Sequence, residues 1–147
     1  SKYRMMLFDL DWALFPSTAH YNLLANLLSP NGHGSGSIFD TSMMRGLMRN
    51  QSFRADFLRR FVELFNTALR PERLETLFQQ AKAEIISEMP RQIERWGLPK
   101  NMAAWEAQTE SMHRVLMVRR KHCIGLFREY FGLSESWLRE NLLDHDW

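Results

Sequence analysis

The sequence predicts a mainly α-helical fold, an orthogonal array or bundle of about six helices with one strand at its N-terminal end. Two observations predict it. Apolar residues recur at helical spacing through most of residues 41–143, and an apolar run without that spacing occurs only over residues 3–11. The chain has 147 residues, of which 45% are hydrophobic. This is enough to bury one core, so we expect residues 1–147 to form a single domain.

The predicted strand ends on two acidic residues. Residues 3–11 are almost wholly apolar up to Asp9 and Asp11 and show no helical spacing of polar residues, which is typical of a buried strand. A lone strand leaves its backbone hydrogen-bonding groups unpaired, and no other segment predicts a strand. We therefore expect the rest of the sheet to lie outside this chain.

A short helix and a loop follow the strand. Residues 20–28 predict the helix, and the glycines and serines of residues 29–37 predict a solvated loop. The three glycines of this loop alternate, but no strand leads into it and no Lys-Ser/Thr pair follows. A phosphate-binding loop is therefore excluded.

The next two helices are marked by capping residues. The first begins at Thr41 or Ser42 and the second at Asn50 or Ser52, because these side chains can accept hydrogen bonds from the first backbone amides of a helix. The second helix carries aromatic residues at successive i+4 positions, which predicts a buried face. These residues are Phe53, Phe57, Phe61 and Phe65.

Prolines divide the middle of the chain. Pro71 fits the first turn of a helix over residues 71–87, and Pro90 interrupts the chain before a short segment over residues 91–96. Gly97 and the proline that follows it end this segment.

The C-terminal third predicts one long helix, a break, and two more helices. Asn101 caps the long helix, and the basic cluster at residues 119–121 marks a possible break. The next helix stops at Gly132, and a last short helix begins at Ser134 and ends near Leu143.

Charge and cysteine content exclude several functions. The net charge of +2 gives no electrostatic case for binding nucleic acid, and no apolar stretch is long enough to span a membrane. Arginine outnumbers lysine 15 to 4, and we expect these arginines to pair with acids inside the molecule. The single Cys123 excludes an internal disulfide and a cysteine-based zinc site, and we expect a buried thiol there.

Asp9 and Asp11 are the candidate metal ligands. At positions i and i+2 of a strand the two carboxylates point the same way, and a divalent cation relieves their repulsion. Hard oxygen ligands suit Mg²⁺ or Mn²⁺ shared with substrate phosphates. Two alternatives stay open: Asp11 caps a turn while Asp9 pairs with an arginine, or Asp9 is the nucleophile of a phosphohydrolase. No catalytic set converges elsewhere, and the five histidines are scattered along the sequence.

Several segments in a fixed order resemble a known family. The strand and its Asp-x-Asp-Trp ending come first, and the likeness is strongest at residues 70–73, 88–97 and 127–133. Together with residues 47–54 and 60–69, these segments resemble the CotH (spore coat protein H) kinase family over nearly the whole chain.

The resemblance implies an atypical bacterial protein kinase that uses ATP and a divalent metal ion. The helices would form the C-terminal lobe of its kinase-like fold. Asp9 and Asp11 are similar to the metal-binding acid of the kinase Asp-Phe-Gly motif, although Ala13 stands where that motif has glycine. The resemblance also favours an extracytoplasmic, cell-surface or spore-coat location.

The family's nucleotide-binding lobe and its catalytic base lie upstream of this strand and have no counterpart in the 147 residues. We therefore expect the chain to be the C-terminal part of a longer protein, to hold no catalytic base, to bind neither ATP nor metal tightly and to be inactive alone. Its expected partners are the missing N-terminal lobe and a protein substrate or surface protein. The alternative is a non-catalytic helical protein-interaction module.

Overall fold

A computed structural model describes residues 14–30, 41–145 and 147 of the chain. All regular structure in these residues is helical, which confirms the mainly α-helical prediction. The strand predicted over residues 3–11, and most of the loop predicted over residues 29–37, lie outside the described residues.

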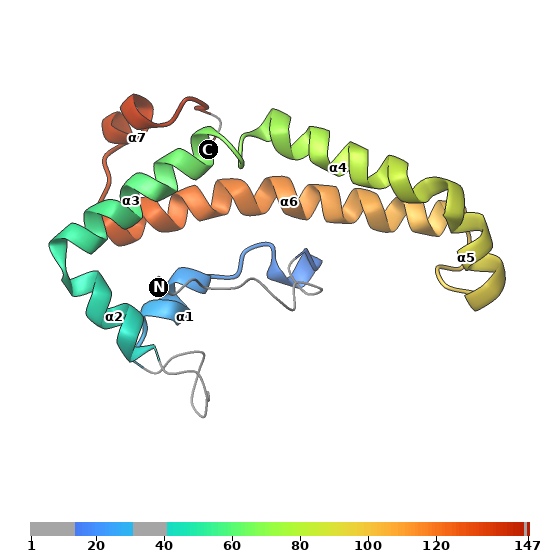
Figure 1. Ribbon diagram of the computed structural model, residues 1–147, viewed down its shortest axis with the longest axis horizontal. Helices are drawn as coiled ribbons and strands as arrows, with labels where there is room; N and C mark the ends of the chain where they lie inside the picture. Colours follow the sequence, from blue (N-terminus) through green and yellow to red (C-terminus); the bar gives the residue numbers. More distant parts are fainter. Residues whose placement is uncertain (1–13, 31–40, 146) are drawn as a thin grey trace, which may run out of the picture.

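One long helix, α6 (Met102–Phe131), forms the axis of the molecule. Helices α3 (Gln51–Asn66) and α4 (Pro71–Ile85) lie along one side of it, and the short helices η1 (Pro16–Thr18) and α1 (Leu23–Leu28) lie on the opposite side (Figure 1). Residues far apart in sequence therefore cover both sides of α6, and residues 14–28 lie against a helix from the C-terminal third of the chain.

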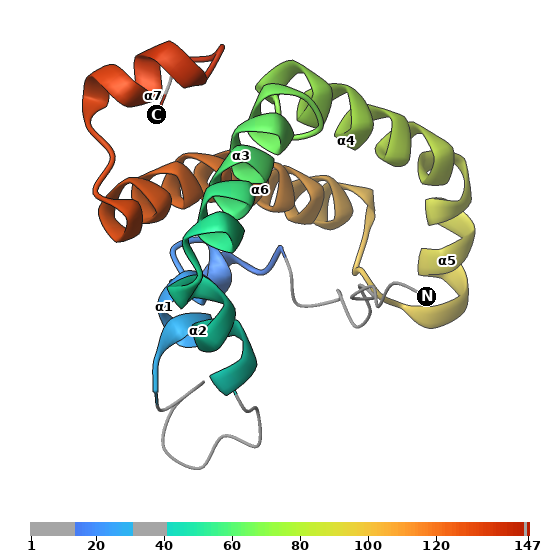
Figure 2. The same cartoon turned by 60° about the vertical axis from the view of Figure 1, so that its left-hand side comes forward.

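The remaining helices extend this arrangement at its two ends. Helix α2 (Ser42–Arg49) projects away from α6 beside α1, and α7 (Glu135–Asn141) turns back beside α3 (Figures 1 and 2). At the other end of α6, the 3-10 turn η2 (Ile86–Glu88) joins α4 to α5 (Met89–Trp96). Pro90 lies in the first turn of α5, so the predicted interruption is confirmed.

The predicted caps explain where several helices begin. The side chain of Asn50 accepts a hydrogen bond from the amide of Phe53 at 3.1 Å, and that of Asn101 accepts one from Ala104 at 2.8 Å. At α1 the helix begins three residues later than predicted, because Asn22 supplies the capping oxygen there.

The break predicted at residues 119–121 is wrong, because α6 continues through it to Phe131. The basic cluster contains no proline or glycine. Hydrogen bonds to segments outside α6 hold two of its side chains. Arg120 donates to the carbonyl of Leu69 at 2.8 Å, and Arg119 donates to the carbonyl of Thr18. Partners that are distant in sequence thus bind these charged side chains, and the helix continues without a break.

The core lies where α3, α6 and α7 meet. Phe61 and Phe65 are buried there with Ile124, Leu138 and Leu142. The ring of Phe61 stacks on that of Phe127 with centroids 3.9 Å apart. The C-terminal half of the aromatic face of α3, Phe61 and Phe65, is therefore part of the core, as predicted.

Gly132 ends α6 with a φ of +66°, in the left-handed region that disfavours side chains. Gly132→Ala should therefore lower the free energy of unfolding by about 1–2 kcal/mol. Gly125→Ala is the matched control, because it lies inside the same helix and a methyl group there meets no atom within 4 Å. The control should raise stability by roughly 0.5–1 kcal/mol. Urea unfolding of both variants measures the difference, and equal effects would contradict this role of Gly132.

Candidate functional site

The predicted metal ligands, Asp9 and Asp11, lie outside the described residues, so their metal site stays a prediction. Within the described ranges, no group of three or more His, Cys, Asp or Glu side chains is arranged to hold a metal ion. Nor is any described helix both long and apolar enough to cross a membrane.

The chain that leaves the Asp-x-Asp segment is anchored on α6. Arg119 of α6 donates hydrogen bonds to the carbonyls of Thr18 and Tyr21, the latter at 3.4 Å. Beside this anchor, Phe15 and Met112 line a cavity of about 390 Å³ between the start of the described chain and α6. Helix α6 therefore holds the backbone at residues 18–21, which follow the acidic segment in sequence.

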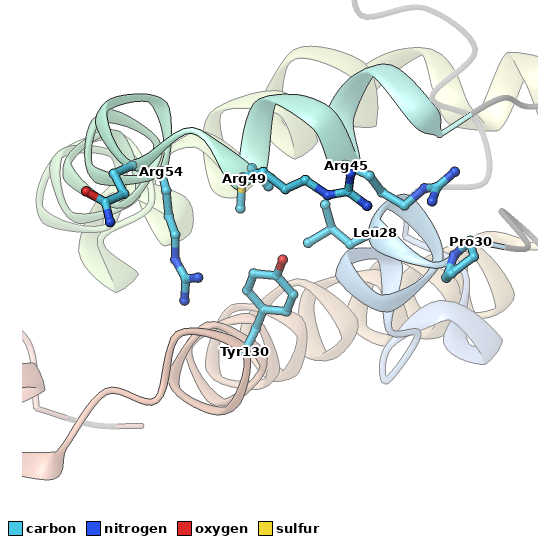
Figure 3. A pocket seen from close by; sticks show the side chains of 8 residues that line it. Leu28, Pro30, Arg45, Arg49, Arg54 and Tyr130 are labelled. Carbon is cyan, nitrogen blue, oxygen red and sulfur yellow. The ribbon is translucent and has the colours of Figure 1, made fainter.

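A larger cavity of about 550 Å³ opens between α1, α2, α3 and α6, and we call it the arginine pocket. Arg45 and Arg49 of α2 and Arg54 of α3 line it, and Tyr130 of α6 faces them (Figure 3). Leu28, at the end of α1, completes the wall opposite α2 (Figure 3). Three guanidinium groups thus border one open space.

Two of these arginines are held by the surrounding structure. Thr41 is buried, and its hydroxyl donates to the carbonyl of Ser29 at 2.8 Å while accepting from Nε of Arg45 at 3.2 Å. The guanidinium of Arg54 lies 5.0 Å from the ring centroid of Phe131 and 5.9 Å from that of Tyr130. These cation–π contacts orient a group that would otherwise move freely.

Elsewhere in the described residues most arginines pair with acids, as predicted. Exposed pairs join Arg59 to Asp56 and Arg60 to Glu63, and similar ones occur on α5, α6 and α7. In the same part of the structure no salt bridge joins an acid to Arg45, Arg49 or Arg54. Within residues 14–30, 41–145 and 147, the expected internal pairing is therefore not seen at the arginine pocket.

A sequence signal for the arginine pocket exists. Residues 41–55 contain three arginines and no aspartate or glutamate, so no acid stands at helical i±3 or i±4 spacing from them. The fourth member, Tyr130, could not be found this way, because only the tertiary fold brings α6 to this face. The arrangement suits a negatively charged ligand and repels cations.

In the described part of the chain, Cys123 and the histidines add no second site. Cys123 is half-buried and not fully buried as predicted. This burial raises the pKa of its thiol, more than nearby Arg119 lowers it, so the thiol stays mainly protonated at neutral pH. The fold brings the rings of His20 and His122 to 5.3 Å, a contact that sequence spacing did not predict. In the described residues this pair lacks the third ligand that a metal site needs.

His113 joins α6 to α4 by contacting the carboxylate of Glu75, and its ring packs on Phe78. Hydrogen bonds from Gln79 and then from His113 lower the pKa of Glu75. Because these partners belong to the packing of α4 on α6, we assign the pair to structure and not to chemistry.

The family comparison covers the acidic segment and most of the helices. The family model described as CotH kinase protein matches residues 1–123 of the 147. Comparisons with curated proteins and with solved structures found no match. The match spans well over half of the chain and includes the Asp-x-Asp segment and the resembling segments up to residue 97, whereas the segment at residues 127–133 lies outside it. The chain therefore belongs to the CotH kinase protein family.

Proposed function

We propose that this chain forms the helical lobe of an ATP- and divalent-metal-dependent protein kinase and that Asp9 and Asp11 hold its metal ion. The observation that carries the proposal is the family match, because residues 1–123 include both acids. Two carboxylates two residues apart are the hard oxygen donors that Mg²⁺ and Mn²⁺ prefer. When bound, such an ion neutralises charge on the phosphate oxygens of a nucleotide.

The chain's own contribution is to hold the acidic segment in place. Arg119 hydrogen-bonds the backbone of Thr18 and Tyr21, and so holds the residues that follow the acidic segment in sequence on the long helix α6. Phosphoryl transfer depends mainly on such positioning together with electrostatic stabilisation. The helices would then act as the rigid base of the site.

Phosphoryl transfer also needs groups that cradle the nucleotide and accept the proton of the substrate hydroxyl. The sequence contains no glycine-rich loop with the phosphate-holding lysine and no catalytic-base motif. We therefore propose that a nucleotide-binding lobe outside these residues completes the enzyme, and that residues 1–147 alone transfer no phosphate. A protein at the bacterial surface or spore coat is the proposed substrate.

A radiolabelled ATP assay tests this proposal on the product of the full reading frame and on residues 1–147 alone. With Mg²⁺ or Mn²⁺, the full product should transfer label to protein, and Asp9→Asn or Asp11→Asn should abolish the transfer. Asp56→Asn is the matched control, because Asp56 is exposed on α3 and pairs only locally with Arg59. Both Asn variants should unfold like the parent when metal is absent.

Unchanged transfer in both variants would contradict the assignment of Asp9 and Asp11. A large loss of metal-free stability would instead support a structural ion pair at Asp9. Release of free phosphate from ATP by residues 1–147 alone would favour the phosphohydrolase alternative.

The second candidate function is a non-catalytic interaction module. Its specific support is the exposure of large apolar side chains at the α4–α5 end, where Trp96 is 61% exposed and Leu98 is 73% exposed. The full reading frame distinguishes the two functions. An intact phosphate-holding lysine and catalytic aspartate support the kinase, and their absence supports the module.

A further inference from the structure

The arginine pocket is lined by positively charged side chains. It places the side chains of Arg45, Arg49 and Arg54 around one cavity, and none of them is joined to an acid in the described residues. Gln51, the first residue of α3, also lines the cavity, so the positive end of the α3 dipole lies at its edge. The positive potential in the pocket therefore comes from side chains and backbone together.

The arginines that line the pocket suit phosphate groups. Guanidinium groups bind phosphate oxygens through paired N–H donors, and a phosphate monoester offers three such oxygens and up to two negative charges. The cavity of about 550 Å³ is within the range of small-molecule sites, so it can hold the group that carries the phosphate as well. Tyr130 and Leu28 supply an aromatic and an aliphatic wall for that group (Figure 3).

The pocket is also partly preorganised. Thr41 fixes Arg45 through a hydroxyl that itself bonds to the carbonyl of Ser29, and the ring of Phe131 supports Arg54. Binding then immobilises fewer side-chain rotamers than it would at an ordinary cluster of surface arginines.

We propose that the arginine pocket binds a phosphate monoester. The bound group is either a phosphorylated serine or threonine side chain or the terminal phosphate of a nucleotide, since both present the same dianion. The inference rests on the geometry of α2, α3 and α6 and does not depend on the proposed phosphoryl transfer.

Calorimetric titration of residues 1–147 tests the proposal. The first probe is a phosphoserine peptide with its unphosphorylated twin as control, and the second is AMP with adenosine as control. At least one phosphorylated probe should bind saturably while its control does not, and added salt should weaken the binding. Tighter binding of the peptide identifies a phosphorylated protein as the source, and tighter binding of AMP identifies a nucleotide.

Arg49→Gln and Arg54→Gln should each weaken that binding at least tenfold. Both side chains are exposed, so the variants should fold, and circular dichroism checks this. Arg59→Gln is the matched control, because Arg59 lies on α3 outside the pocket and already pairs with Asp56. It should change the dissociation constant by less than twofold.

Two results would overturn the proposal: no saturable binding of either phosphorylated probe, or equal weakening by Arg59→Gln, which would indicate a diffuse charge effect. A chain that binds phosphate here but belongs to no active kinase would leave this inference intact and contradict only the proposed function.

Discussion

Replacing Phe61 with alanine should lower the free energy of unfolding by about 3–5 kcal/mol. Phe61 is only 4% exposed, and its ring lies 3.9 Å from that of Phe127 and 4.4 Å from that of Phe65, measured between centroids. Truncation removes a large buried apolar surface and leaves a cavity between α3 and α6. Stacked rings cannot close such a cavity without moving the helices that carry them.

Chemical denaturation followed by circular dichroism measures this loss. Leu64→Ala is the matched control, since Leu64 lies on the same helix but is 36% exposed. The control should cost about 1–2 kcal/mol, less than Phe61→Ala, because part of the area that it removes is already in water. A loss below about 1 kcal/mol for Phe61→Ala would show that the α3–α6 contact is not the core of the folded chain.

The features that sequence analysis predicted correctly depend on neighbours along the chain. The i+4 spacing of Phe61 and Phe65 predicts the buried face of α3, and the caps at Asn50 and Asn101 predict where α3 and α6 begin. Such signals are local, because a helix repeats within four residues and a cap reaches only three.

The features that sequence analysis missed depend on contacts between distant residues. The basic cluster at residues 119–121 marks a possible break in the sequence, but α6 runs through it. In the structure Arg120 reaches Leu69, and Arg119 reaches Thr18 across about a hundred positions. The three arginines of the arginine pocket carry a local signal, but Tyr130 could not be predicted, since it joins α2 and α3 only after α6 has packed. The metal ligands Asp9 and Asp11 remain predicted from their spacing and from the family alone.

Replacing Asp144 with asparagine should lower the free energy of unfolding by about 3 kcal/mol. Its carboxylate lies 2.7 Å from the guanidinium of Arg120, whose side chain is only 4% exposed and also donates to the carbonyl of Leu69. The ring of Phe65 covers the same guanidinium at 5.6 Å. Removing the carboxylate leaves a positive charge among apolar groups, and the cost of that desolvated charge is much larger than the loss of an exposed pair.

A second substitution separates this buried charge from a general loosening of the C-terminal segment. Adding Arg120→Met to Asp144→Asn should restore part of the lost stability, because the charge that lacks its partner is gone. The restoration should be incomplete, since the carbonyl of Leu69 loses its donor. Asp56→Asn, which breaks an exposed pair, should cost less than about 1 kcal/mol. If Asp144→Asn costs no more than this control, Arg120 finds water or another acid in the variant, and the pair does not fasten the C-terminal segment to α6.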